Sequence, residues 1–500
     1  MGYPGARDTG SVIILDSVIS GTDTAVLVPT PRSGDKQQQS LVLDNLKVVN
    51  VDVIVKTDGG VKLLSGGTTT ITSWGIGKKY ANTAGTGTYV AGDDITPHRT
   101  IDPSLLGGPN HGIFERSRPQ YESTPVSGFT DVCNNGAKGD GTTDDTDAIN
   151  TVLAKNAGKS IVYFPAGTYI VTDTIFVPVG SKIVGEAWSQ IMATGPKFAD
   201  MRNPKVMVQV GKPGDAGVIE ITDMLFTVRG ATAGAVLMEW NVKQRTPGSA
   251  AMWDSHFRVG GSIGSNLQNA NCPKLTGVVN DKCIAGSMLL HLTKSSSAYL
   301  ENVWMWVADH DLDIPAQTQI DIYVARGTLI QSQGPTWMYG TASEHCTLYQ
   351  YQLCGVKNLF MGMIQTETPY WQSTPRAPEP FTPSLNKFPD DPTFSDCPSG
   401  SLTCAMAWGL RIISSSNIYT YGAGLYSFFN SYNQECLDSE SCQDDMVEII
   451  KSTGLWFYNF ITKASTNSIS PRGGRAVPQS ENHFGFGSTI VAWLTLSGAI

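Results

Sequence analysis

The sequence predicts an all-β protein built as a right-handed parallel β-helix, a solenoid in which each coil stacks on the one before it. Its 500 residues include 52 glycines and only 16% charged residues, against roughly 25% in an average soluble chain. Short apolar runs, such as residues 12–15 and 161–164, are separated by Gly, Ser, Thr and Asn, and helical periodicity is scarce. Many short strands without hairpin dipeptides favour coil-like connections and exclude a long charged coiled coil.

A loose repeat gives the second indication of a solenoid. In each copy an Asn or Asp stands directly before an apolar-rich strand; these residues are Asn45, Asp223, Asn302, Asn358 and Asn417. Asn and Asp are typical turn residues because they tolerate a left-handed backbone. Each coil of a β-helix must turn such a corner before its strand lies on the previous coil. The alternative is a chance recurrence of common residues.

The chain divides into three parts on this interpretation. Residues 1–100 are expected to be the last coils of a preceding β-helix, and residues 101–128, rich in Pro, Gly and polar residues, a linker. Residues 129–500 form a second β-helix domain, which starts with a capping helix after the Asp-rich residues 140–147. A proline-rich stretch, residues 368–400, is expected to be an ordered, functional loop.

The nine cysteines point to an oxidising compartment. Eight of them fall into short-range couples, which favour disulfides over zinc ligands or free thiols; the couples are Cys272 with Cys283, Cys397 with Cys404, Cys436 with Cys442, and Cys346 with Cys354. The last couple is the weakest, because it lies in an apparent strand where both residues could instead be core thiols. Cys133 is left over. Because no secretory signal is visible, we expect the true N-terminus to be missing from this chain.

Two acidic residues lie one coil apart. Glu344 and Glu367 are separated by 23 residues, so they can occupy neighbouring rungs about 4.8 Å apart. Like charges at this separation raise one pKa and keep a carboxylic acid protonated near neutral pH. Trp and Tyr residues surround both, and rings beside paired acids are typical of a sugar-cleaving cleft. Alternatively, both are solvated rim residues.

No metal or cofactor is expected. Asp140 to Asp147 lack the final Glu of a calcium loop and precede a helix that needs capping. Alternation along a strand would separate Asp309, His310, Asp311 and Asp313. The net charge of −9 disfavours nucleic acid as a partner, and the last apolar run, residues 489–500, is too short to span a membrane.

The motifs carry a family resemblance. Residues 139–150 and 161–169 resemble the opening of a pectate-lyase-like β-helix. Four further stretches together resemble glycoside hydrolase family 55, the mostly fungal exo-β-1,3-glucanases or laminarinases; they are residues 256–261, 300–311, 332–345 and 365–370. The resemblance extends over essentially the whole chain. Its opening motif is shared by many β-helix proteins, whereas the later set is specific.

The resemblance implies a secreted, monomeric glycosidase without a cofactor, whose partner is β-1,3-glucan. It would release glucose from the non-reducing end with inversion. Glu367 would be the general acid, and Glu344 the neighbouring acid that tunes it or helps to hold water. The implied substrate-binding residues are Trp306, Asp309, Trp337 and Tyr370.

Members of this family carry two tandem β-helices with the cleft between them, so the chain resembles an N-terminally truncated member. Carboxyls on neighbouring rungs, near 5 Å apart, would also be closer than the roughly 6.5–9.5 Å of an inverting pair. Other groups, on the missing first domain, would then hold the water. Two alternatives stay open: an inactive glucan-binding fragment, and a polysaccharide lyase on the same fold.

Overall fold

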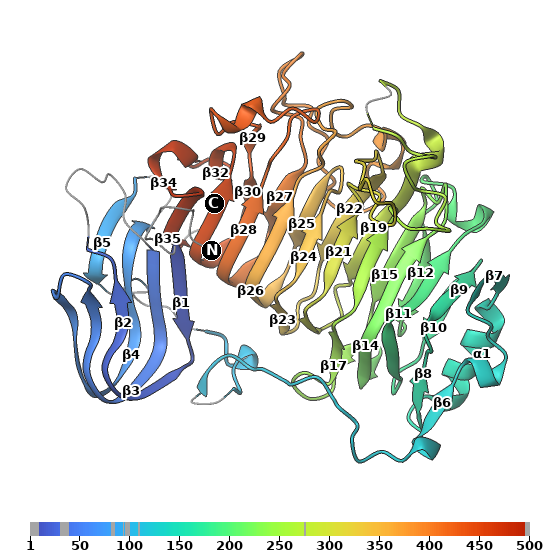
Figure 1. The fold of residues 1–500 in the computed structure, drawn as a ribbon, viewed down its shortest axis with the longest axis horizontal. Coiled ribbons are helices and arrows are strands. Elements are labelled where there is room, and N and C mark those ends of the chain that lie inside the picture. The colour runs from blue at the N-terminus through green and yellow to red at the C-terminus, as the bar shows by residue number, and fades with distance from the viewer. Residues whose placement is uncertain are drawn as a thin grey trace.

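The computed structural model describes residues 10–495 except 31–39, 82–85, 94, 96–100, 109–110 and 275–276. Its main body is a parallel β-helix whose coils each contribute to a 22-stranded sheet and to an 11-stranded sheet. The coils run from α1 at one end to β35 at the other (Figure 1). The all-β, parallel β-helix fold predicted from the sequence is confirmed.

The large sheet carries most of the strands of the solenoid. In chain order they are β6 (Phe129–Asp131), β7 (Asp140–Asp144), β8 (Ile161–Tyr163), β9 (Gly167–Val171), β11 (Lys182–Ala193), β14 (Ile219–Val228), β17 (Ala250–Trp253), β18 (His256–Val259), β20 (Tyr299–Glu301), β21 (Trp304–Val307), β23 (Thr336–Tyr339), β24 (Ala342–Glu344), β26 (Lys357–Glu367), β28 (Ser416–Tyr426), β31 (Thr453–Lys463), β34 (His483–Phe484) and β35 (Gly487–Thr495).

The second sheet closes the back of each coil. Its strands are β10 (Ile175–Val177), β12 (Lys205–Val210), β15 (Ala235–Trp240), β19 (Ile284–Leu292), β22 (Tyr323–Ile330), β25 (Tyr349–Cys354), β27 (Trp408–Ile413), β29 (Gln443–Asp445), β30 (Val447–Ile450), β32 (Ser465–Pro471) and β33 (Val477–Pro478). A small pair is formed by β13 (Ala216–Gly217) and β16 (Lys243–Gln244). Apolar side chains from both sheets fill the space between them and form the main core.

The Asn and Asp repeat marks the corners of the coils, as predicted. Asn45, Asp223, Asn302, Asn358 and Asn417 all have a φ between +50° and +58°, the left-handed region that these residue types tolerate. Their side chains also bond along the stack. The amide of Asn302 donates to Asp254 at 3.1 Å, and that of Asn417 donates to Asn358 at 3.0 Å. Polar corners therefore hold neighbouring coils in register.

The strands of residues 11–93 continue the large sheet beyond the last coil. β1 (Ser11–Leu15) and β2 (Val18–Val28) lie parallel to β3 (Ser40–Thr57), whereas β3, β4 (Lys62–Tyr80) and β5 (Thr88–Asp93) are antiparallel. β4 pairs with β35 through Lys79 and Tyr80, so these strands stand beside the C-terminal coils (Figure 1). The division of the chain at residues 100 and 129 stays a prediction.

Residues 101–128 connect these strands to the far end of the solenoid and pack closely on the way (Figure 1). Leu105 and Ile113 are buried against the aromatic outer face of the large sheet. The backbone carbonyl of Phe114 accepts a hydrogen bond of 2.9 Å from Tyr339, and the Arg116 guanidinium pairs with Glu220. The expected linker is therefore a strap that covers the sheet.

The single α-helix among the described residues, α1 (Thr146–Asn156), caps the first coil and buries Ile149, Val152 and Leu153. The Asp144 carboxylate accepts the Thr146 N–H at 3.0 Å, so this Asp-rich stretch caps the helix start.

Among the described residues, no cluster of His, Cys, Asp and Glu could hold a metal, and no helix is long and apolar enough to cross a membrane. Short 3₁₀ turns complete the elements: Pro103–Leu105, Val126–Gly128, Cys133–Asn135, Pro196–Phe198, Asp281–Cys283, Thr382–Ser384, Glu435–Leu437 and Gln479–Glu481.

Three predicted disulfides are confirmed: Cys272–Cys283, Cys397–Cys404 and Cys436–Cys442. The fourth and weakest couple, Cys346 with Cys354, forms no disulfide. Cys346 is buried in the core, while the Cys354 thiol donates to Asp390 at 3.0 Å, so the two thiols are free and face different surroundings. Cys133 is also free.

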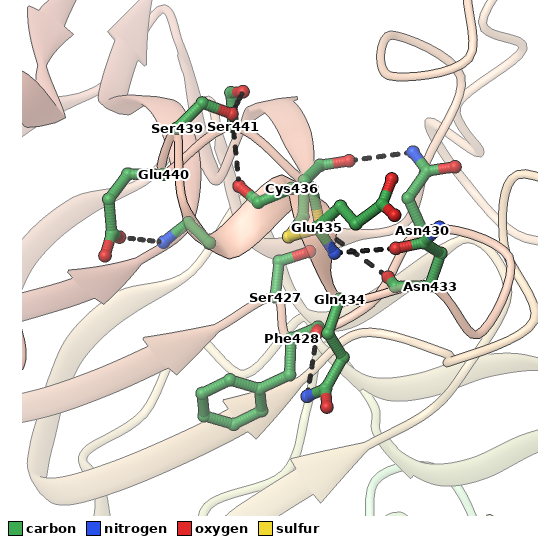
Figure 2. Close-up of a disulfide and its surroundings, with 12 residues drawn as sticks. Ser427, Phe428, Asn430, Asn433, Gln434, Glu435, Cys436, Ser439, Glu440 and Ser441 are labelled. Carbon is green, nitrogen blue, oxygen red and sulfur yellow. Dashed lines mark hydrogen bonds between the residues drawn. A yellow bond between two sulfur atoms is a disulfide. The ribbon is translucent and has the colours of Figure 1, made fainter.

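The third disulfide closes a small loop beside β28. Figure 2 shows Asn433 accepting the Glu435 N–H at 2.6 Å and the Gln434 amide donating to the Phe428 carbonyl at 3.4 Å. Asn430 donates to the Cys442 carbonyl at 3.0 Å. These bonds fix the segment that follows β28 and carries Phe428 and Phe429 toward the end of β26.

Candidate active site

One row of side chains crosses the large sheet from strand to strand. Strands β18, β21, β24, β26, β28 and β31 place six residues directly opposite one another: Arg258, Trp306, Glu344, Glu367, Tyr426 and Lys463. The two acids are immediate partners in the middle of this row. Their placement on neighbouring rungs, predicted from their spacing, is confirmed, while their roles stay predictions.

The Glu344 side chain is buried and accepts a hydrogen bond from an indole. Its residue is 6% exposed, and the indole N–H of Trp304 donates to its Oε2 at 2.8 Å. Burial raises the pKa of Glu344 to about 7, and the charge of Glu367 acts in the same direction while His345 opposes both. An ordinary glutamate is ionised at neutral pH, whereas this carboxyl keeps its neutral form accessible there.

Glu367 has more polar surroundings than Glu344. The Tyr370 hydroxyl donates to its Oε2 at 2.8 Å, and Nε2 of His345 lies 3.4 Å from the same oxygen. Burial acts to raise the pKa of Glu367, but the hydrogen bonds and the charge of His345, with Tyr370, outweigh it and leave the pKa below its ordinary value. The two glutamates thus differ in charge although they sit side by side.

His345 contacts both Glu367 and Asp309 and was not among the site residues predicted from the sequence. It is 4% exposed, with Nδ1 2.9 Å from the Val307 carbonyl and 3.7 Å from Oδ1 of Asp309. Burial lowers its pKa, but the negative charges of Asp309 and Glu367 outweigh burial and raise the pKa to about 9. Only its position directly after Glu344 could have drawn attention to it.

Asp309 and Tyr370, both predicted as substrate-binding residues, lie close to the acid pair. Asp309 is 9% exposed and pairs with the imidazole of His310. The Tyr370 ring stands 4.8 Å from His345 and 4.0 Å from Phe429, centroid to centroid. Asp311 instead accepts the backbone N–H of Asn269 at 2.9 Å, so the acidic stretch is split between two sites.

Aromatic rings flank the carboxyls on both sides. Trp306 is only 4% exposed and stacks on Trp304, centroid to centroid at 5.0 Å, whereas Trp304 is 37% exposed. On the other side Tyr426 stacks on Phe428 at 5.3 Å. Trp304 and Tyr426 offer more ring surface to a ligand than the predicted Trp306 does.

Trp337 lies elsewhere, and its prediction as a substrate-binding residue is not supported by its position. It is fully buried beneath the strap, and its indole N–H donates to the Leu105 carbonyl at 3.1 Å. In the sheet it stands between Tyr299 and Phe360, in the separate aromatic core. A buried ring that already has its hydrogen-bond partner has no face left for a sugar.

Comparisons with known proteins agree with this architecture. The family model described as rhamnogalacturonase A/epimerase, pectate lyase-like, matches residues 129–249. Three curated fungal relatives match more of the chain. "Glucan 1,3-beta-glucosidase" of Cochliobolus carbonum is 38% identical over 92% of this chain and 57% of its own length. "Probable glucan endo-1,3-beta-glucosidase" of Arthroderma benhamiae is 51% identical over 78% and 44%.

The third relative, "Non-secreted LysM effector LysM15" of Penicillium expansum, is 45% identical over 98% of this chain and 33% of its own length. The chain thus spans a third to somewhat over half of these relatives. A solved structure, sacteLam55A from Streptomyces sp. SirexAA-E, is 13% identical over 95% of this chain and 72% of that chain, with a TM-score of 0.43.

The fold and the family model define a pectate-lyase-like β-helix protein. Within that class, the similarity to proteins named glucan 1,3-β-glucosidases along most of the chain supports the predicted identification with glycoside hydrolase family 55.

Proposed function

We propose that this chain carries the acid-catalyst half of a β-1,3-glucan hydrolase. The observation that carries the proposal is the Glu344–Glu367 pair, in register on neighbouring strands and flanked by aromatic rings. Paired carboxyls in different environments supply the proton donor that cleavage of a glycosidic bond requires. Rings cover the apolar faces of neutral sugars. The names of the curated relatives support the same substrate class.

In this proposal Glu367 protonates the departing glycosidic oxygen, and Glu344 sets the electrostatic conditions beside it. Trp306, Asp309 and Tyr370 are the proposed substrate-binding residues, with Trp304 and Tyr426 added from their exposure. The relatives' names include both an endo-acting enzyme and an unspecified glucosidase. We propose that this chain acts in the exo mode and releases single glucose units from the non-reducing end.

We also propose that the reaction inverts the configuration at the anomeric carbon. Strands in one sheet are about 4.8 Å apart, which is nearer the spacing of a retaining pair than the roughly 6.5–9.5 Å of an inverting pair. We propose that the attacking water is held by groups outside this row. Proton NMR of freshly released glucose gives its anomeric form: α-glucose supports inversion, and β-glucose contradicts it.

We further propose that the protein acts outside the cell as a monomer. Three disulfides favour an oxidising compartment, although the name of one relative describes that protein as non-secreted. Size-exclusion chromatography with light scattering tests the monomer, and the fraction of protein in the culture medium of the native host tests secretion.

The decisive experiment measures glucose release from laminarin by the purified 500-residue chain. Glu367→Gln should lower the rate by about 10²- to 10⁴-fold, because an amide cannot donate the proton. Glu435→Gln, on an exposed loop, is the matched control and should retain the wild-type rate. Laminarin binding without glucose release would instead favour the glucan-binding alternative. Activity on polygalacturonate that a chelator abolishes would favour the lyase.

A further inference from the structure

We propose that His345 is a positioning residue that stores the proton which Glu367 delivers to the leaving group. This inference rests on the proposed hydrolase function and adds to it a source for the catalytic proton. Three contacts carry it: Nδ1 of His345 faces the Val307 carbonyl at 2.9 Å, Asp309 stands behind the ring at 3.7 Å, and Nε2 faces Glu367 at 3.4 Å.

The first contact decides which ring nitrogen can titrate. A backbone carbonyl only accepts hydrogen bonds, so Nδ1 of His345 must carry a hydrogen in both charge states. The second ring nitrogen, Nε2, is then the one that gains or loses a proton. Nε2 points at Oε2 of Glu367, so the titrating nitrogen and the proposed acid catalyst face each other directly.

The surrounding charges favour the imidazolium form. Asp309 and Glu367 lie within 4 Å of the ring nitrogens, and Glu344 is the adjacent residue in the chain. The imidazole of His310 also lies nearby, against Asp309. The Tyr370 hydroxyl and the Cys346 thiol complete the titratable neighbours, and burial raises the pKa of both above the ordinary value. Negative charge thus dominates around His345, in line with its raised pKa.

The backbone holds the ring in this position. His345 has a φ of +66°, and its N–H donates to the Glu367 carbonyl at 2.8 Å. The end of β24 is therefore tied to the end of β26 by the two residues that share the proton.

The proposed step is a simple proton transfer. The Nε2–H bond of His345 breaks and an O–H bond forms on Oε2 of Glu367, which leaves a neutral imidazole and a neutral carboxylic acid. The acid then donates this proton to the glycosidic oxygen as the bond between that oxygen and the anomeric carbon breaks, and Glu367 returns to its carboxylate. The oxygen of a water molecule bonds to the anomeric carbon, and the proton that this water releases returns through solvent to Nε2 of His345.

A direct test follows the imidazole of His345 by ¹⁵N–¹H NMR, with His345→Asn used to assign its signal. Asn keeps a donor for Val307 and tolerates the left-handed backbone. We expect the ring to remain an imidazolium at pH 7.5. A neutral ring at that pH would overturn the inference, and this readout is independent of any activity on glucan.

A kinetic test separates proton storage from a structural role. The alkaline limb of the kcat profile on laminarin should move to lower pH in His345→Gln, because Glu367 must then hold the proton alone. kcat should fall with KM nearly unchanged. The loss should be smaller on a nitrophenyl β-glucoside, whose leaving group needs little protonation.

The matched control is His291→Gln on β19, in the other sheet and buried beside Glu239; its profile should equal that of the wild type. An unchanged alkaline limb in His345→Gln, or an equal loss on both substrates, would overturn the inference. A wild-type chain that releases no glucose while the NMR result holds would instead count against the proposed function alone.

Discussion

At the scale of single residues, the acid pair shows how different surroundings shift the pKa values of two glutamates in opposite directions. Glu344 is enclosed and accepts one indole hydrogen bond, whereas Glu367 accepts a hydrogen bond from a hydroxyl and faces the imidazole of His345. Replacing Glu344 by Gln mimics its neutral form. The mutant should therefore lose little activity at pH 5 and about tenfold more above pH 7, where the wild-type carboxylate would hold the proton on Glu367. The pH dependence of laminarin hydrolysis measures this; an equal loss at both pH values would contradict it.

The same carboxyl predicts how stability depends on pH. Folding raises the pKa of Glu344 to about 7, so its neutral form favours the native state at low pH and this contribution is lost as pH rises toward that value. His345, with its pKa raised to about 9, loses its contribution between its unfolded pKa and that value. The melting temperature should fall from pH 5 to pH 9, and Glu344→Gln should melt higher than the wild type at pH 8. Scanning calorimetry tests both.

At the scale of elements, the corner residues connect sequence to register. Asn358 combines a φ of +58° with a hydrogen bond from Asn417. Asn358→Ala should lower stability by about 1–3 kcal/mol, because alanine disfavours this backbone conformation. Asn358→Gly loses the same hydrogen bond but adopts a positive φ freely, so it should be less destabilised than Ala in urea unfolding. Equal destabilisation would assign the effect to the hydrogen bond alone.

The strap gives a prediction at the next scale, because it joins parts far apart in the chain. Trp337→Phe removes the hydrogen bond to Leu105 and should speed proteolytic cleavage within residues 101–128. Trp456→Phe is the control: within the described part of the chain its indole N–H has no partner, so the change removes no bond. Mass spectrometry of the fragments identifies the cleavage sites, and equal cleavage in both variants would contradict the prediction.

The sequence predicts features that depend on residues close together in the chain, and it does not predict those that depend on contacts between distant residues. The corner Asn residues, the short disulfide loops and the one-coil spacing of the two glutamates are local properties, and the structure agrees with each. The burial of Trp337 depends on a segment 232 residues away, and the position of His345 depends on Asp309 and Glu367 from other coils. Spacing within one coil carries no information about such contacts.

At the scale of the whole molecule, the pairing of β4 with β35 joins Lys79 to Ala492. A solenoid exposes a strand at each end, and an open edge invites other chains to add to it. Here α1 closes the first coil, while the N-terminal strands extend the sheet past β31 and β35 at the last. This closure requires contact between residues over 400 positions apart, and such contacts form slowly during folding. The last coil therefore spends the early part of folding with its edge uncovered, and that interval is when the protein is most exposed to aggregation.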